Sequence, residues 1–214
     1  VAEKWQKVTG NVLSVGYGLS ETSPAVSIDP IGVDKFSDSL GLPLPSTEIS
    51  IQDDNGNFLN FDVPGEICIR GPQVMKGYWN NNDETKNTIT SDGWFKTGDI
   101  GIMNHRGFTK IVDRKKDMII ISGFNVYPNE IEEIAMMNEN VFEAGCIGIK
   151  DNAGNEKIKL FISKKPNSNL SIDDIFEHCK KYLTGYKIPE FIEFIDEIPK
   201  SNVGKVLRRK LREL

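Results

Sequence analysis

Two runs decide the fold: Phe95-Lys96-Thr97-Gly98-Asp99 and Val112-Asp113-Arg114-Lys115-Lys116-Asp117. They predict a carboxylate, Asp99, and a guanidinium, Arg114, at adjoining strand ends with one hairpin (residues 101–112) between them. A carboxylate at a tight Thr-Gly-Asp turn can accept hydrogen bonds from the cis hydroxyls of a ribose, and an arginine nearby can reach the same sugar or its phosphate. The alternative is an ion pair that pins the hairpin, and both can hold in a nucleotide-free protein.

The sequence on the N-terminal side of these runs is mostly strand and loop. Alternating polar and apolar residues predict half-buried strands, and Asn/Gly-rich segments predict the turns between them. We expect helices at 1–8 and 80–88, and strands at 12–15, 47–51, 66–70 and within 95–113, with a hairpin turn at 104–107.

After Lys116 the pattern changes to alternating strands and helices. Pro128 suits the first position of a helix, and Ser171 is the expected cap of an amphipathic helix at 172–183. We expect strands at 118–121, 143–149, 157–163 and 191–195, and a basic helix after residue 204. The prediction is an α+β chain with a boundary at Lys115–Lys116, which gives domains of residues 1–115 and 116–214.

Composition limits the classes of protein. The chain has 214 residues, and no apolar run approaches the roughly 20 residues that span a bilayer. Its three cysteines are far apart and lack paired zinc-ligand spacing, so they predict reduced, buried thiols in a cytoplasmic protein. The absence of an initiator methionine favours an excised piece over a natural short protein.

Charge is spread unevenly along the chain. The net charge is −5, but residues 200–214 hold six basic residues and one acidic residue, which leaves −10 on residues 1–199. Such a tail can contact nucleic acid or anionic lipid. No aromatic residue is interleaved there, so we expect no nucleic-acid partner. Most of the tail is expected to be the solvated face of a terminal helix, and the phosphates of a nucleotide suffice as partners for the rest.

Three further runs, at 16–22, 122–132 and 199–209, complete an ordered set: Gly-Tyr-Gly-Leu-Ser-Glu-Thr, Ser-Gly-Phe-Asn-Val-Tyr-Pro-Asn-Glu-Ile-Glu and Pro-Lys-Ser-Asn-Val-Gly-Lys-Val-Leu-Arg-Arg. In this order the five runs resemble the adenylate-forming enzymes, which include acyl-CoA synthetases, adenylation domains and luciferases. The sequences of residues 112–118 and 122–130 are most similar to those of bacterial long-chain fatty-acid–CoA ligases. The resemblance implies a strand-rich last subdomain of a large AMP-binding domain (1–115), followed by a small mobile C-terminal domain (116–214).

The first of these runs implies a nucleotide site. Tyr17 is expected to stack on adenine, Gly18 to let the ligand approach the backbone, and Ser20 to contact a phosphate. Glu21 is the magnesium-linked carboxylate, because Mg²⁺ prefers a few carboxylate ligands together with phosphate oxygens. The family pattern usually has threonine where this chain has Ser20, and the hydroxyl is kept. Asp99 is implied to bind the ribose, with Arg114 as its companion.

The later runs imply the rest of the machinery. Lys205 is expected to bridge the attacking carboxylate and the α-phosphate of ATP; as part of a helix start it would be mildly unfavourable, which favours a functional role. Ser122 and Gly123 are implied to offer backbone contacts to the pantetheine of CoA, although a plain strand-to-helix turn is the simpler interpretation. Lys116 aligns with the hinge of the small domain.

The resemblance implies a two-step reaction: a fatty acid and ATP give acyl-AMP and pyrophosphate, and CoA then displaces AMP. Nothing in residues 1–15 resembles the family's phosphate loop, and the acyl tunnel lies upstream too, so we expect an inactive C-terminal part of a longer enzyme. Alternatives are a medium-chain or aryl-CoA ligase, or a stand-alone nucleotide- or CoA-binding module. Peripheral membrane association is plausible for a fatty-acid ligase, with only the basic tail to support it.

Overall fold

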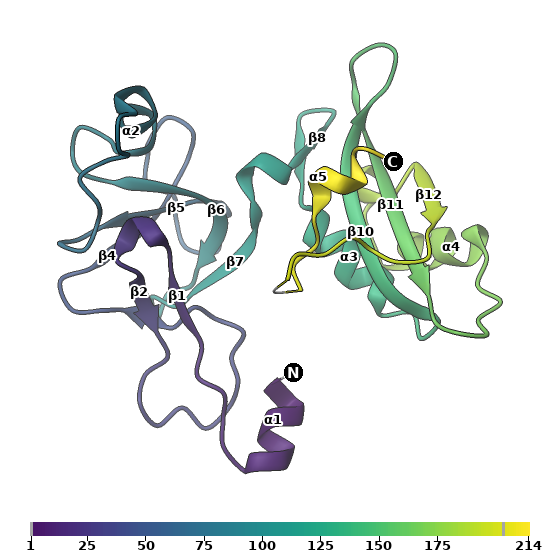
Figure 1. Ribbon diagram of the computed structural model, residues 1–214, viewed down its shortest axis with the longest axis horizontal. Helices are drawn as coiled ribbons and strands as arrows, with labels where there is room; N and C mark the ends of the chain where they lie inside the picture. The colour runs from purple at the N-terminus through teal and green to yellow at the C-terminus, as the bar shows by residue number, and fades with distance from the viewer. Residues whose placement is uncertain (1, 203) are drawn as a thin grey trace. The chain divides into compact units, whose positions relative to one another are not determined.

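The computed structural model describes residues 2–202 and 204–214, so Val203 of the lysine run lies outside the described residues. The chain separates into two compact units, Val1–Lys115 and Lys116–Leu214, whose elements are labelled in Figure 1. Each unit has its own hydrophobic core.

Unit 1 contains two antiparallel sheets. A three-stranded sheet has the order β1-β2-β3, and a four-stranded sheet has the order β4-β5-β6-β7 (Figure 1). The strands are β1 (Gly16–Gly18), β2 (Ala25–Ile28), β3 (Leu42–Pro43), β4 (Glu48–Gln52), β5 (Gly65–Arg70), β6 (Phe95–Met103) and β7 (Thr109–Arg114). The helices are α1 (Ala2–Thr9), the one-turn η1 (Ser20–Thr22) and α2 (Asn82–Thr88).

The two sheets of unit 1 share one core. Val26 of β2, Ile67 and Ile69 of β5 and Phe95 of β6 are buried together. Ile67 and Ile69 face the same side of β5 because alternate residues of a strand do so. The expected strand at 12–15 is wrong: those residues lack regular structure, and β1 begins at Gly16.

Unit 2 is built on a three-stranded sheet of order β10-β11-β12, with a separate hairpin of β8 and β9. β10 and β11 pair antiparallel, and β11 and β12 pair parallel. The strands are β8 (Ile119–Ile121), β9 (Phe124–Val126), β10 (Val141–Lys150), β11 (Glu156–Lys164) and β12 (Phe191–Phe194). The helices are the one-turn η2 (Lys115–Asp117), α3 (Pro128–Met136), α4 (Ile172–Tyr182), the one-turn η3 (Gly185–Lys187) and α5 (Arg208–Leu211).

Both faces of the unit 2 sheet are covered. One face buries the core cluster that includes Ile131 of α3, Ile175 of α4 and Leu160 of β11. On the other face, Phe161 of β11 is buried with Leu211 of α5. Adjacent residues Leu160 and Phe161 therefore lie in different cores, as the two-residue period of a strand requires.

Local sequence signals predict the starts of α3 and α4 correctly. Pro128 lies in the first turn of α3. Ser171 accepts a hydrogen bond from the backbone of Asp174, whose carboxylate bonds back in a capping box. The helix expected directly after Gly204 begins only at Arg208, so the placement of Lys205 at a helix start is wrong.

Among the described residues, no helix is long and apolar enough to cross a membrane. All three cysteines are buried thiols. Burial raises the pKa of Cys179 to about 11. Burial, with the neighbouring charge of Glu66, raises the pKa of Cys68 to about 12. Both thiols are therefore expected to be protonated and unreactive near neutral pH.

Candidate functional site

Asp99 and Arg114 are direct cross-strand partners in the β6–β7 ladder. Arg114 Nε lies 2.7 Å from Asp99 Oδ1, and the Asp99 side chain is only 3% exposed. Tyr17 Oη donates a 2.6 Å hydrogen bond to the other carboxylate oxygen, Asp99 Oδ2. The predicted ion pair is thus present. A carboxylate oxygen has two lone pairs, so Asp99 can accept further hydrogen bonds while keeping both partners.

Tyr17 is held by its neighbours from two directions. Its ring packs against the unit 1 core cluster, and its hydroxyl donates to Asp99. Burial, the charge of Asp99 and their hydrogen bond raise the pKa of Tyr17 well above its usual value. The phenol is therefore a permanent donor at physiological pH.

The tight Thr-Gly-Asp turn expected at a strand end is wrong, because Thr97, Gly98 and Asp99 lie inside β6. Gly98 has a positive φ of 71° there, at a point where the pairing with β5 shifts register, and a buried glutamate bonds to this kink. Glu66 Oε1 accepts a 3.0 Å hydrogen bond from Gly98 N, and Glu66 Oε2 lies 2.9 Å from Lys115 Nζ. Lys115 also pairs with Asp54 at 2.6 Å. Burial opposes the charge on Lys115, but the hydrogen bonds to Asp54 and Glu66 outweigh it and raise its pKa. Glu66 therefore connects the β6 kink at Gly98, next to Asp99, to the last residue of unit 1.

The 16–22 run forms a close turn between β1 and β2. A Cβ on Gly18 would lie 1.9 Å from the carbonyl oxygen of Pro24, so no side chain fits there. Ser20 is exposed and Glu21 is partly buried in the one-turn helix that follows. Tyr78 Oη donates a 3.0 Å hydrogen bond to Glu21 Oε1. This bond and burial raise the pKa of Tyr78, burial being the larger cause.

The Glu21 carboxylate suits a cation such as Mg²⁺ whose other ligands come mainly from a bound nucleotide and water rather than from the protein. The described residues contain no group of three or more His, Cys, Asp or Glu that could form a complete protein site. Mg²⁺ usually keeps several waters and takes one or two carboxylates together with phosphate oxygens. A single oriented carboxylate is therefore the appropriate donor set for a metal–nucleotide complex.

Ser122 and Gly123 form the turn of the β8–β9 hairpin, where Ile121 pairs with Phe124. Both have positive φ, 51° at Ser122 and 85° at Gly123, which matches the two-residue turn that right-twisted hairpins favour. The simpler interpretation, a plain strand-to-helix turn, is therefore wrong, because a second strand, β9, precedes the helix.

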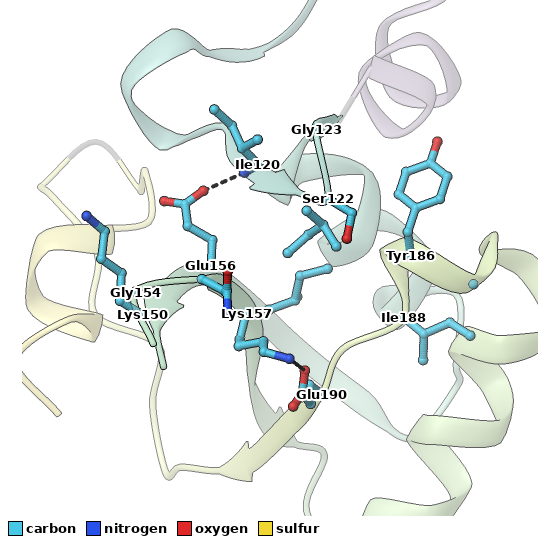
Figure 2. A pocket seen from close by; sticks show the side chains of 14 residues that line it. Ile120, Ser122, Gly123, Lys150, Gly154, Glu156, Lys157, Tyr186, Ile188 and Glu190 are labelled. Atoms are coloured by element: carbon cyan, nitrogen blue, oxygen red, sulfur yellow. Dashed lines mark hydrogen bonds and ion pairs between the residues drawn. The ribbon is translucent and has the colours of Figure 1, made fainter. Parts of the chain in front are cut away.

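The hairpin turn lies on the edge of an open pocket of about 730 Å³ in unit 2. Figure 2 shows Lys150, Lys157 and Tyr186 among the side chains that line it. Lys157 pairs with Glu190 at 2.8 Å, and the Tyr186 ring stacks on Phe124 with centroids 4.8 Å apart. The pocket thus combines two lysines with two glutamates, Glu156 and Glu190, an aromatic face and an exposed turn.

Lys205 is exposed on a hydrogen-bonded hairpin in which Lys200 pairs with Val206. Ser201 N donates to Lys205 O at 2.8 Å, and Lys205 N donates to Ser201 Oγ at 3.2 Å. Lys205 therefore lies in a turn with defined hydrogen bonds to the backbone and side chain of Ser201.

Comparison with known proteins agrees with these local geometries. The sequence model of the AMP-binding enzyme family matches residues 1–79, and that of the AMP-binding enzyme C-terminal domain matches residues 130–205. Long-chain-fatty-acid–CoA ligase of Yersinia pestis is 51% identical over the whole chain. The chain belongs to the adenylate-forming AMP-binding enzymes.

The chain spans 38% of the length of the Yersinia pestis relative. A mitochondrial medium-chain acyl-CoA ligase of Mus musculus is 38% identical over 97% of this chain, which spans 34% of that protein. The crystal structure of ATP-bound MatB from Rhodopseudomonas palustris matches this chain with a TM-score of 0.92 at 30% identity. The match covers 99% of this chain and 42% of the MatB chain. The matched segments agree with the expected C-terminal portion of an adenylate-forming enzyme.

Within this adenylate-forming chain, the structure brings together Tyr17, Asp99 and Arg114, three of the predicted nucleotide residues. Sequence reasoning missed Glu66, Tyr78 and Arg208. The signal for Glu66 was available, because it is an acidic residue directly before the apolar run Ile67-Cys68-Ile69 and a buried charge needs partners. Tyr78 carried no comparable signal, since its partner Glu21 is distant in sequence, and Arg208 was visible only as a member of the 199–209 run, without its partners.

Proposed function

We propose that this chain is the C-terminal part of a long-chain fatty-acid–CoA ligase. The observation that carries the proposal is the Tyr17–Asp99–Arg114 cluster in a chain that is 51% identical to such a ligase. In the proposed reaction, a fatty carboxylate attacks the α-phosphate of ATP, forming acyl-AMP and releasing pyrophosphate. The thiol of CoA then attacks the acyl carbon, and AMP leaves.

Each predicted residue takes one role in this proposal. Asp99 accepts the ribose hydroxyls, and Arg114 and Tyr17 keep its carboxylate ionised and oriented. The exposed face of Tyr17 stacks on adenine, Gly18 leaves room for the nucleotide, and Ser20 contacts a phosphate. These assignments are supported by the short contacts to Asp99.

Mg²⁺, when bound, neutralises charge on the phosphates of ATP. Glu21 is the residue that would hold it, and the hydroxyl of Tyr78 keeps the Glu21 carboxylate in one orientation. Lys205 stabilises the charge that develops while the α-phosphate is attacked. Its exposed ammonium on a defined hairpin supports this role.

The second half-reaction is assigned to unit 2. The backbone of Ser122 and Gly123 guides the pantetheine arm of CoA, and the adjoining pocket with Lys150 and Tyr186 offers a cation and an aromatic face to its nucleotide. Lys116, the first residue of unit 2, is the hinge between the two half-reactions.

The test is fatty-acid-dependent ATP–pyrophosphate exchange by the 214-residue chain beside the full-length protein, with palmitate and benzoate as acids. Exchange by the full-length protein with palmitate alone is the expected result. Exchange with benzoate alone would favour an aryl-CoA ligase, and octanoate distinguishes a medium-chain ligase in the same assay. Exchange by the short chain would refute the requirement for the upstream phosphate loop, and no exchange at all would refute the proposed ligase.

Lys205→Ala tests the adenylation role. We expect ATP–pyrophosphate exchange to fall at least about 100-fold, as when one charge-stabilising donor is removed. Thioester formation from supplied acyl-adenylate should be largely kept. Equal loss of both half-reactions would contradict the assignment.

Cytoplasmic location and peripheral membrane association are part of the same proposal. The basic tail gives the latter less support than its charge suggests, because Lys200, Arg208 and Arg212 form ion pairs within unit 2. Arg209 is 86% exposed and Lys210 is also exposed, so two arginine or lysine side chains beside Lys205 remain for anionic lipid. Sedimentation with phosphatidylglycerol vesicles, compared with phosphatidylcholine vesicles, tests this surface.

A further inference from the structure

Arg208, three residues after Lys205, makes several contacts within unit 2. Its side chain is only 11% exposed although arginine is rarely buried. The guanidinium contacts four groups: Asn129 Oδ1 at 2.6 Å, Glu132 Oε1 at 2.9 Å, the carbonyl oxygen of Cys146 at 3.1 Å and Asp117 Oδ2 at 3.8 Å.

These partners lie on regular elements of unit 2. Glu132 lies on α3, and its Oε1 also accepts a 2.7 Å hydrogen bond from Cys146 N on β10. Asp117 accepts a second arginine, with Arg212 Nη2 at 2.9 Å from its Oδ1. The side chains of Asp117 and Glu132 are each 9% exposed. Two buried carboxylates are thus balanced by two arginines of the C-terminal segment.

Apolar packing also holds the C-terminal segment against the sheet of unit 2. Leu211 is 1% exposed and Ile198 is fully buried, both against Phe161 of β11. A Cβ on Gly145 would lie 2.7 Å from Leu211 Cδ1, so the absence of a side chain on β10 lets α5 approach the strand. The segment is therefore anchored before and after the hairpin that carries Lys205.

We propose that Arg208 is a positioning residue for Lys205. Arg208 follows the Lys200–Val206 hairpin by two residues and ties its outgoing end to α3 and β10. The planar guanidinium has five donors in a fixed fork and can satisfy several acceptors at once, whereas an ammonium cannot reach all of them. This inference rests on the proposed function, in which Lys205 acts on the α-phosphate. A displacement of about 1 Å can cost about 100-fold in rate.

The first experiment measures, without any substrate, how strongly the hairpin that carries Lys205 is protected from hydrogen exchange. Hydrogen–deuterium exchange of the 214-residue chain is compared for wild type, Arg208→Lys and the control Arg209→Lys. Arg209 is the adjacent arginine, 86% exposed, with a single 4.0 Å ion pair to Glu213. We expect faster exchange in peptides covering 200–211 for Arg208→Lys only, with β10 and β11 unchanged. Wild-type exchange in 200–211, or faster exchange throughout unit 2, would overturn the proposal.

The second experiment separates positioning from folding. In the full-length protein, Arg208→Lys is expected to lower the kcat of ATP–pyrophosphate exchange about 10- to 100-fold, with less than about a threefold change in the KM for ATP. Thioester formation from supplied acyl-adenylate should change less than about threefold, and Arg209→Lys should match wild type in both. Equal loss of both half-reactions would overturn the proposal.

Failure of this inference is distinguishable from failure of the proposed function. If Lys205→Ala leaves adenylation intact, the catalytic role of Lys205 is wrong whatever Arg208 does. If Lys205→Ala abolishes adenylation while Arg208→Lys behaves as wild type in both experiments, the proposed function stands and the positioning role of Arg208 is wrong.

Discussion

Replacing Glu66 with glutamine should destabilise unit 1 because this carboxylate joins two parts of the unit. Glu66 is 7% exposed at its side chain, accepts Gly98 N and holds the Lys115 ammonium at 2.9 Å. Glutamine preserves the shape and one carbonyl oxygen, but its amide nitrogen cannot accept a hydrogen bond from Lys115. A hydrogen bond to a charged group contributes about 1.5–3 kcal/mol, so we expect a loss of about 2 kcal/mol.

Intrinsic fluorescence isolates this effect, since all three tryptophans (Trp5, Trp79 and Trp94) lie in unit 1. Trp94 is 4% exposed and reports on the core of that unit. With a urea dependence of about 2 kcal/mol per molar, the unfolding midpoint of Glu66→Gln should fall by about 1 M.

Glu48→Gln is the matched control. Glu48 lies on β4, beside β5, and makes two hydrogen bonds to Arg70, but its side chain is 58% exposed. Exposed ion pairs contribute little because water and salt screen them. The control should unfold at the wild-type midpoint. If Glu66→Gln shifts the midpoint no more than Glu48→Gln, burial does not strengthen the Glu66 contacts and the reasoning fails.

Three further predictions concern the same chain. Gly18→Ala places a methyl group 1.9 Å from the Pro24 carbonyl oxygen, so the tryptophan-detected stability should fall by about 1–3 kcal/mol; wild-type stability would contradict the close approach. The stability of wild-type unit 1 should fall as pH rises above about 10, because Tyr17 ionises in the unfolded chain but keeps its proton in the folded chain. In urea titrations the stability of Tyr17→Phe should fall less steeply from pH 10 to 12. Identical slopes for wild type and Tyr17→Phe would refute this. At pH 8 the folded chain should react with a disulfide reagent far more slowly than the urea-unfolded chain, which should titrate all three cysteines; fast labelling of Cys68 or Cys179 in the folded chain would contradict their raised pKa values.

Features that depend on neighbours in the sequence were predictable. Ser171 caps α4 and Pro128 begins α3 because a cap or a fixed φ acts within one helical turn. The Asp99–Arg114 pair was predictable for a similar reason, since one hairpin of known length joins the two residues. The strand expected at 12–15 failed because β1 is short, and its position depends on pairing with β2 rather than on its own pattern.

The role of Lys205 shows the limit of local reasoning. Its motif was readable, but the helix start expected around it is a hairpin, and the helix begins at Arg208. The reason is tertiary: Lys200 pairs with Val206, and Arg208 turns inward to acceptors that lie 62 to 79 residues earlier in the chain. No sequence window contains both ends of such a contact.

The sequence by itself determined the family, the helix caps and the identity of the chemical groups, because ordered motifs and capping rules act over a few residues. The tertiary structure alone decided which of those groups are buried and what they touch. It placed the Tyr17 hydroxyl on Asp99, the Glu66 carboxylate on the backbone of Gly98 within β6, and Arg208 among buried acceptors. Burial converts an ordinary polar side chain into one that must find a partner, and the partner is chosen by the packing of distant strands and helices.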